Sequence, residues 1–155
     1  MKYTLFLILA FVCTDALSQS SLIFPDSLGW NTLNENEEVK FTVKTTRAVP
    51  PNFSIQGVGG LHIEFDSLGN FQWKPSYELV DRVEKTKVFG IIFELSLPDG
   101  TRERQEVSFT INHVNRPPVI EDLPVVYVKQ SNLNTYQIQS EFVYDLDNDP
   151  LVFKS

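Results

Sequence analysis

Residues 88–97, with the sequence VFGIIFELSL, carry the clearest indication of the fold class of this chain. Apolar side chains stand at every second position of this stretch: Phe89, Ile91, Phe93, Leu95 and Leu97. A period of two is typical of a β-strand that has one face in a core and the other in water. Pro98-Asp99-Gly100 follows as a turn, because proline pre-sets φ and glycine accepts positive φ. The chain then returns through a second alternating stretch around Phe109, so the sequence predicts a β-hairpin here.

The same alternation recurs before this hairpin, in short segments separated by turn residues. The inward-facing sets are expected to be Val39, Phe41 and Val43, then Leu61, Ile63 and Phe65, and then Phe71 and Trp73. No long segment has helical periodicity, and residues 76–87 have room for one helical turn only. Many short strands with frequent turns predict an all-β sandwich.

The first eighteen residues are expected to be a signal peptide. Lys2 precedes an apolar run at residues 3–12, and Ala16-Leu17-Ser18 offers small residues for cleavage before Gln19. This run of about ten residues is shorter than the roughly twenty that span a bilayer. The alternative is a lipoprotein acylated at Cys13, although bulky side chains precede that cysteine. The sequence therefore predicts export, with an extracellular or cell-surface location favoured over a periplasmic or lipid-anchored one.

Charge and cysteine content limit which partners the protein can bind and how its fold can be stabilised. The net charge is −7 and no basic stripe is present, which argues against nucleic acid as a partner. Cys13 is the only cysteine, so a chain cleaved before Gln19 has no disulfide and must be held by core packing. The full sequence contains 12 Phe, 2 Trp and 5 Tyr, enough aromatic residues to argue against disorder.

A domain boundary is expected at residues 115–118, with the sequence NRPP. Two prolines cannot donate ladder hydrogen bonds, and each pushes the preceding residue into an extended conformation, which makes a stiff joint. Residues 19–114 are then one sandwich domain. Residues 119–155 are fewer than a second sandwich of roughly a hundred residues needs, so we expect them to be the start of a second repeat within a longer array. Strands are expected there at residues 125–128 and 136–138.

Three motifs in this order resemble tandem cadherin-like (dystroglycan-type) and putative-Ig repeats of bacterial surface or secreted proteins. Gly69-Asn70-Phe71-Gln72-Trp73-Lys74-Pro75 is similar to their G-x-F-x-W-x-P signature, and residues 115–120 (NRPPVI) are similar to the joint that opens each repeat. Residues 145–151 (DLDNDPL) are similar to their D-x-D-x-D-P-L element. The resemblance implies immunoglobulin/cadherin-like Greek-key β-sandwiches that serve as adhesins or spacers. The first repeat departs from the pattern, because residues 45–51 (TTRAVPP) contain no carboxylate.

Asp145, Asp147 and Asp149 form the only set of residues with metal-ligand character. Carboxylates are hard oxygen donors that suit Ca²⁺, and three neighbouring carboxylates repel one another unless they are neutralised. Pro150 stands where an EF-hand loop needs glycine, which excludes that motif. The sequence predicts a calcium site here, and the alternative is a solvated acidic turn.

Catalysis finds little support in the sequence. His62 and His113 each lie in an alternating segment, where an exposed or rim position with no particular partner is expected. No nucleophile elbow is present, and residues 56–60 (QGVGG) open no predicted helix, so they do not form a phosphate loop. We therefore expect a non-enzymatic protein.

The function predicted from the sequence is an adhesive or spacer module. It would bind a protein or glycan ligand at the cell surface and contact neighbouring repeats of its own chain. The alternative is an accessory carbohydrate-binding module with an aromatic platform. Trp73 and Phe71 share the predicted inner face, so Trp30, in a loop-like stretch, is the better candidate for such a platform.

Overall fold

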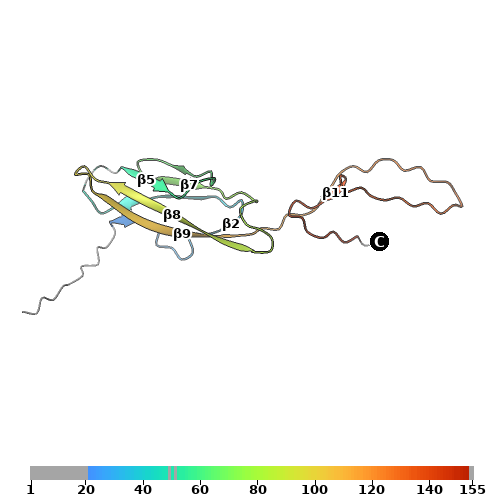
Figure 1. The fold of residues 1–155 in the computed structure, drawn as a ribbon, viewed down its shortest axis with the longest axis horizontal. Helices are drawn as coiled ribbons and strands as arrows, with labels where there is room; N and C mark the ends of the chain where they lie inside the picture. Colours follow the sequence, from blue (N-terminus) through green and yellow to red (C-terminus); the bar gives the residue numbers. More distant parts are fainter. Residues whose placement is uncertain (1–20, 49, 51, 154–155) are drawn as a thin grey trace, which may run out of the picture.

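The computed structural model describes residues 21–48, 50 and 52–153, and Figure 1 shows their arrangement. The predicted signal peptide, with Cys13 and the cleavage site before Gln19, lies outside the described residues. The described chain is all-β, and its segment at residues 76–85 contains turns without a helix. No helix that could cross a membrane occurs in the described part of the chain.

Two facing sheets form a sandwich, as the sequence predicts. The larger sheet contains, in spatial order, β2 (Thr32–Asn34), β9 (Arg102–Asn112), β8 (Thr86–Ser96) and β5 (Phe53–Gln56). The smaller sheet contains β3 (Val39–Thr42), β7 (Asn70–Trp73) and β6 (Glu64–Phe65). β1 (Leu22–Ile23) pairs with β4 (Lys44–Thr45), which follows β3 after Val43. The chain passes from β3 to β5, back to β6 and β7, and across again to β8, which is a Greek-key path between two sheets.

The predicted hairpin is the longest element of the sandwich. β8 and β9 pair from Thr86 opposite Asn112 to Ser96 opposite Arg102. Gly100 adopts a φ of 87°, and the Asp99 carboxylate accepts a hydrogen bond of 2.8 Å from the Thr101 N–H group. The turn predicted from the sequence is confirmed.

Aromatic side chains fill the space between the two sheets. Phe71 stacks on Phe109 with ring centroids 5.5 Å apart, and Trp73 meets Phe109 edge-to-face at 5.6 Å. Most inward positions predicted on the hairpin strands are buried, whereas Phe89 and Leu97 are half-buried at the edge of the core. The residues with no exposed surface are Ile91, Phe93, Leu95, Phe109 and Ile111. Burial of apolar side chains is the main favourable contribution to folding, so this layer holds the domain together without a disulfide.

The first residue of the repeat-like motif, Gly69, has to be a glycine for two structural reasons. Its φ is 91°, and a Cβ atom there would lie 2.5 Å from the Val43 carbonyl oxygen and 3.0 Å from the Phe53 ring. The Val43 N–H group also donates a 2.8 Å hydrogen bond to the Gly69 carbonyl oxygen. Only glycine fits both the backbone conformation and this close approach.

Residues 119–153 project from the end of the sandwich and contain a single strand pair (Figure 1). This pair joins β10 (Val119–Ile120) to β11 (Val143–Tyr144). The strands predicted at residues 125–128 and 136–138 are wrong, because both segments lie outside any sheet and are exposed. No neighbouring strand satisfies their backbone groups, so strand-forming side chains alone do not produce a sheet there.

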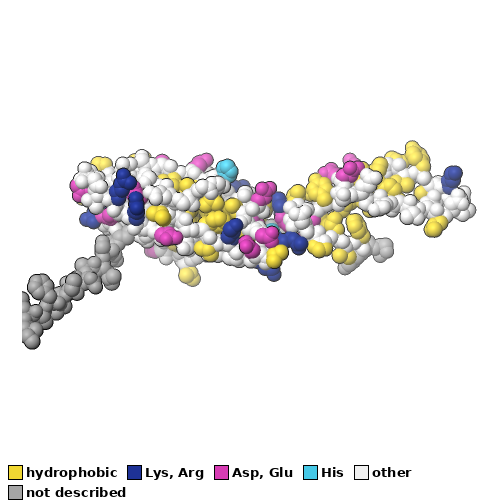
Figure 2. Space-filling view, in the orientation of Figure 1, with side chains coloured by type: hydrophobic (Ala, Val, Ile, Leu, Met, Phe, Trp, Pro, Cys, Tyr) yellow, Lys and Arg dark blue, Asp and Glu magenta, His cyan; other side chains and the backbone are white. Residues whose placement is uncertain are grey.

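The projecting segment has no core of its own. Val143 is the only apolar side chain of residues 119–153 that is buried. Figure 2 shows apolar side chains along its surface, and those with large exposed fractions include Tyr127, Leu133 and Val125. Its position on the sandwich therefore depends on polar contacts at the joint.

Candidate functional site at the joint between the sandwich and the projecting segment

The joint is made by Arg116, which lies in the predicted boundary at residues 115–118, and by the acidic turn at residues 145–149. The Arg116 backbone N–H group donates a 2.6 Å hydrogen bond to Oδ2 of Asp147. Its guanidinium donates to the other oxygen, Oδ1, from Nε at 2.8 Å and from a terminal nitrogen at 2.6 Å. The same terminal nitrogen contacts the Leu146 carbonyl oxygen at 2.9 Å. Both oxygens of one carboxylate are thus held by one arginine 31 positions earlier in the chain.

This pair is largely removed from solvent. The Asp147 side chain is 3% exposed and the Arg116 side chain 20% exposed. The Arg116 guanidinium also lies 5.0 Å from the centre of the Tyr77 ring, a cation–π contact with the loop that precedes β8. Hydrogen bonds from Arg116 hold the pKa of Asp147 below its ordinary value of 3.8. The Asp147 carboxylate in turn raises the pKa of Arg116, so each charge stabilises the other.

A second ion pair at the joint is more exposed. Arg82 contacts Oδ1 of Asp149 at 3.1 Å, with side chains 40% and 36% exposed. Pairs of this kind contribute little to stability, typically about 0–1 kcal/mol. The two pairs therefore differ in burial and in number of hydrogen bonds, although both join the sandwich to the same acidic turn.

The structure places all three predicted metal ligands in this turn. Oδ1 of Asp145 accepts hydrogen bonds from the backbone N–H groups of Asp147 and Asp149, at 2.8 and 3.1 Å. The carboxylates are thus engaged by two arginines and by backbone donors, and in the described chain no group of three His, Cys, Asp or Glu side chains is placed to hold a metal ion. Calcium binding at Asp145, Asp147 and Asp149 stays a prediction, and it requires Arg116 to release Asp147. Thermal unfolding with calcium and with a chelator tests it.

Glu35 is a joint residue that sequence reasoning missed. Its side chain has no exposed surface, and it accepts hydrogen bonds from the N–H groups of Val80 (2.9 Å) and Val114 (3.0 Å). Nδ1 of His113 lies 2.9 Å from Glu35 Oε2, so the expectation that His113 has no particular partner is wrong. A signal was present in the sequence: Glu35 stands two positions after the buried Leu33 and shares its face of the chain. His62 is exposed, in agreement with the sequence.

Trp30 is not the surface platform that its loop-like context predicts. Its ring lies 5.0 Å from Phe41 and 5.6 Å from Phe109, both edge-to-face, and 6.0 Å from Phe24 in a stacked arrangement. The loop before β2 folds Trp30 against the open end of the aromatic core, because a large ring gains more from contact with other rings than from water. Phe71 and Trp73 are buried, at 2% and 1% exposed, as the sequence predicts.

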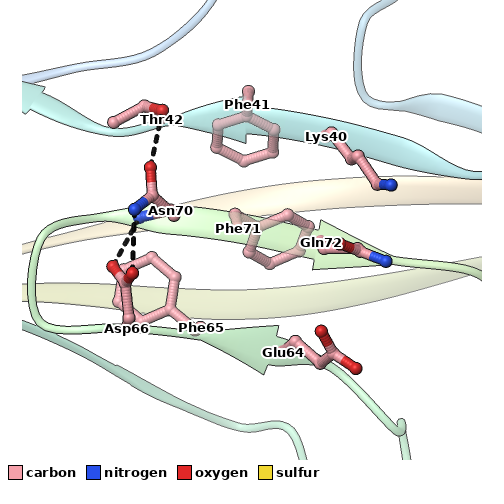
Figure 3. Close-up of a pocket in the computed structure, with 9 residues that line it drawn as sticks. All are labelled: Lys40, Phe41, Thr42, Glu64, Phe65, Asp66, Asn70, Phe71 and Gln72. Carbon is pink, nitrogen blue, oxygen red and sulfur yellow. Dashed lines mark hydrogen bonds between the residues drawn. The ribbon is translucent and has the colours of Figure 1, made fainter.

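The outer face of the smaller sheet has a shallow hollow of about 580 Å³, drawn in Figure 3. Thr42 in β3 donates to the Asn70 side chain in β7 at 3.0 Å, and Asn70 donates to Asp66, in the turn after β6, at 2.8 Å. The hydrogen bond from the Asn70 side chain, with those from the backbone N–H groups of Asn70 and Leu68, lowers the pKa of Asp66. The polar row is satisfied within the protein, and we attribute a structural role to it.

No protein-family model matches this chain, and no curated protein matches its sequence.

Proposed function

We propose that this protein is an exported, non-catalytic adhesive or spacer module whose joint is stiffened by Arg116. The observation that carries the proposal is the Arg116–Asp147 pair, in which one buried carboxylate receives three hydrogen bonds from one residue. A spacer needs its parts held in a fixed direction. The joint favours this, because two prolines restrict the backbone and the arginine ties it to the following segment.

The position of the contacts supports the same function. Arg116 follows β9 at the end of the sandwich, and the projecting segment continues away from it (Figure 1). Tyr77 and Arg82 come from the loop before β8, so this loop contacts the joint at two points. In cadherins calcium ions hold such joints; in this chain the cationic side chain of Arg116 supplies a positive charge to Asp147.

A glycan-binding accessory module is the alternative function. Such a module would need an aromatic platform on its surface, and Trp30, the candidate expected from the sequence, packs on the core instead. We therefore place the spacer function first.

Replacing Arg116 with alanine in the chain from residue 19 to 155 should loosen the joint. The loss of charged hydrogen bonds to Asp147 is expected to cost about 2 kcal/mol in local stability, and hydrogen exchange at the amide of residue 116 should become roughly 30-fold faster. Arg82→Ala is the matched control, because it removes an exposed pair at the same turn and should change exchange roughly twofold or less. Equal exchange rates in the two variants would contradict a clamp at Arg116.

Acid should loosen the same joint in the wild-type chain. The pKa of Asp147 is lowered in the folded state by Arg116, so its contribution is complete above the ordinary value of 3.8 and is lost as pH falls through the lower value. Exchange at residue 116, corrected for its intrinsic pH dependence, should rise in that acidic range in the wild type. It should rise less in the Asp147→Asn variant, whose side chain at this position does not titrate.

Export is a separate part of the proposal. The protein recovered from the medium or cell envelope should begin at Gln19, or within a residue or two of it. N-terminal sequencing that found Met1 on exported protein would sink this part, and a mass increase by a lipid at Cys13 would favour the anchored alternative.

A further inference from the structure

The outer face of the larger sheet carries two arginines around one buried carboxylate. Glu94 in β8 stands opposite Arg104 in β9, and Arg102 is two positions earlier on the same face. The neighbours Phe93 and Leu95 are buried in the core, so Glu94 faces outward, yet only 3% of its surface is exposed. The two arginines and Gln56 in β5 contact the Glu94 carboxylate and shield it from solvent.

Both oxygens of Glu94 are engaged by these neighbours. Nε of Arg104 donates to Oε2 at 2.6 Å, and the Gln56 amide lies 3.4 Å from the same oxygen. A terminal nitrogen of Arg102 lies 3.3 Å from Oε1. The carboxylate thus fixes two guanidinium groups side by side, and their side chains remain 53% and 61% exposed.

The arrangement leaves positive charge and unused donors at the surface. Each guanidinium has five N–H donors in a planar fork, and Arg104 uses its Nε on Glu94. No second acceptor for either arginine occurs within the described chain. Two cations share one anion at this site, in a protein whose net charge is −7.

Nearby acids do not neutralise the pair. Glu106 lies on the same face, but its side chain extends over Gly90, where the absence of a Cβ atom leaves room for it. That position is on the far side of Ile92 from Glu94 in the strand register. Asp99 is engaged by Thr101 in the turn, and Glu103 by Ser21 and Arg47.

We propose that Arg102 and Arg104 form a binding site for an oxyanion group of an acidic polysaccharide. Guanidinium forks fit carboxylate and sulfate groups with two parallel hydrogen bonds, and Glu94 has already fixed the forks, which reduces the entropy lost on binding. The outward neighbours Ser54, Gln56 and Ser96 are small or polar, and Ile92 is the apolar neighbour on this face. Such a surface suits a hydroxyl-rich chain better than an apolar peptide, which needs pockets for its side chains.

The site is independent of the joint. It lies beside the turn that links β8 to β9, whereas Arg116 follows the opposite end of β9. The proposed spacer function and this site can therefore fail separately.

Titration of the chain from residue 19 to 155 with heparin, which carries sulfate, and with polygalacturonate, which carries carboxylate, tests the site. Binding to either is expected at physiological salt, and neutral dextran should not bind. The Arg102→Gln/Arg104→Gln variant should bind about tenfold more weakly or worse, the loss expected for charge-assisted hydrogen bonds. Glutamine can still donate to Glu94, and unchanged thermal unfolding would show that the variant folds.

The Lys40→Gln/Lys44→Gln variant is the matched control. It removes the same charge outside the larger sheet, from Lys40 in β3, which is also paired with a glutamate at 3.1 Å, and from Lys44 in β4. Affinity should stay within about twofold of wild type, since nonspecific attraction falls off over roughly 8 Å at physiological salt. A second variant, Arg102→Lys/Arg104→Lys, keeps the charge and removes the forks, so it should bind more weakly than wild type while remaining folded.

Three results would overturn the proposal. The first is no binding of either polyanion by the wild type. The second is an equal loss in the arginine and lysine-to-glutamine variants, which would mean nonspecific attraction. The third is arginine-dependent binding of polyglutamate that is tighter than binding of both polysaccharides, which would assign the site to an acidic protein.

Discussion

Replacing Trp73 with alanine should lower the free energy of unfolding by about 3–5 kcal/mol, the range for removing a large aromatic side chain from a core. Trp73 is 1% exposed and lies between the two sheets, where its ring meets Phe109 edge-to-face at 5.6 Å and Phe89 at 6.0 Å. The lost contacts and the cavity both add to the cost, because a packed interior relaxes only partially around a deletion. A loss of that size is a large fraction of the roughly 5–15 kcal/mol typical of a folded domain.

Urea unfolding followed by far-ultraviolet circular dichroism measures this effect, since the variant has lost a fluorescent tryptophan. Leu28→Ala is the control, because Leu28 is fully exposed and its removal should change stability by about 0.5 kcal/mol or less. Trp73→Phe should give an intermediate loss and remains measurable if the alanine variant does not fold. A Trp73→Ala variant as stable as wild type would contradict the core assignment.

The sequence predicts the sandwich well because a strand has a fixed period. Phe93, Leu95 and Phe109 are all buried as their alternation requires, and the turn at Pro98-Asp99-Gly100 closes the hairpin in the expected place. These features depend on residues close together in the chain. Local patterns are sufficient where the structure is decided by local conformation and by a strong inside–outside contrast.

Local sequence patterns do not predict the structure where a segment needs a neighbouring strand or a distant side chain as its partner. Residues 125–128 (VVYV) are β-branched and aromatic, which predicts a strand, but no strand lies beside them, and Val125 is 79% exposed. The prediction for Trp30 is wrong in the opposite direction. Its loop has no alternating pattern, yet the ring of Trp30 packs onto the core. Pattern tells which residues can form a strand, and only the tertiary arrangement decides whether the backbone groups find partners.

The sequence predicts where the candidate site lies but not its chemistry. It draws attention to both the Pro-rich joint and the three aspartates, but it does not show that Arg116 and Asp147, 31 positions apart, meet. Carboxylates in a row suggest a cation, and the cation in contact with Asp147 is a guanidinium. The arginine that stands shortly before β10 is the only sequence signal of this pairing, and it is weak without the fold.

Replacing Glu35 with alanine should cost about 3–5 kcal/mol, because it removes a fully buried side chain that accepts several hydrogen bonds. The Val80 and Val114 N–H groups would lose their acceptor, and each buried unsatisfied group costs about 1–3 kcal/mol. Nδ1 of His113 would lose its partner as well. Glu35→Gln should cost less, because it keeps the shape and one acceptor oxygen.

Glu38→Ala is the matched control for Glu35, since it removes a glutamate three positions later whose side chain is 42% exposed. Its pair with Lys40 is on the surface, so its loss should cost about 0.5 kcal/mol. Hydrogen exchange at the amides of Val80 and Val114 adds a local measurement: both should become faster in Glu35→Ala and stay unchanged in Glu38→Ala. Because Val114 lies two residues before Arg116, the same variant should also speed exchange at the joint. Slow exchange at all three amides in Glu35→Ala would mean that the joint is held without its buried carboxylate, and Glu35 would then have no part in fixing it.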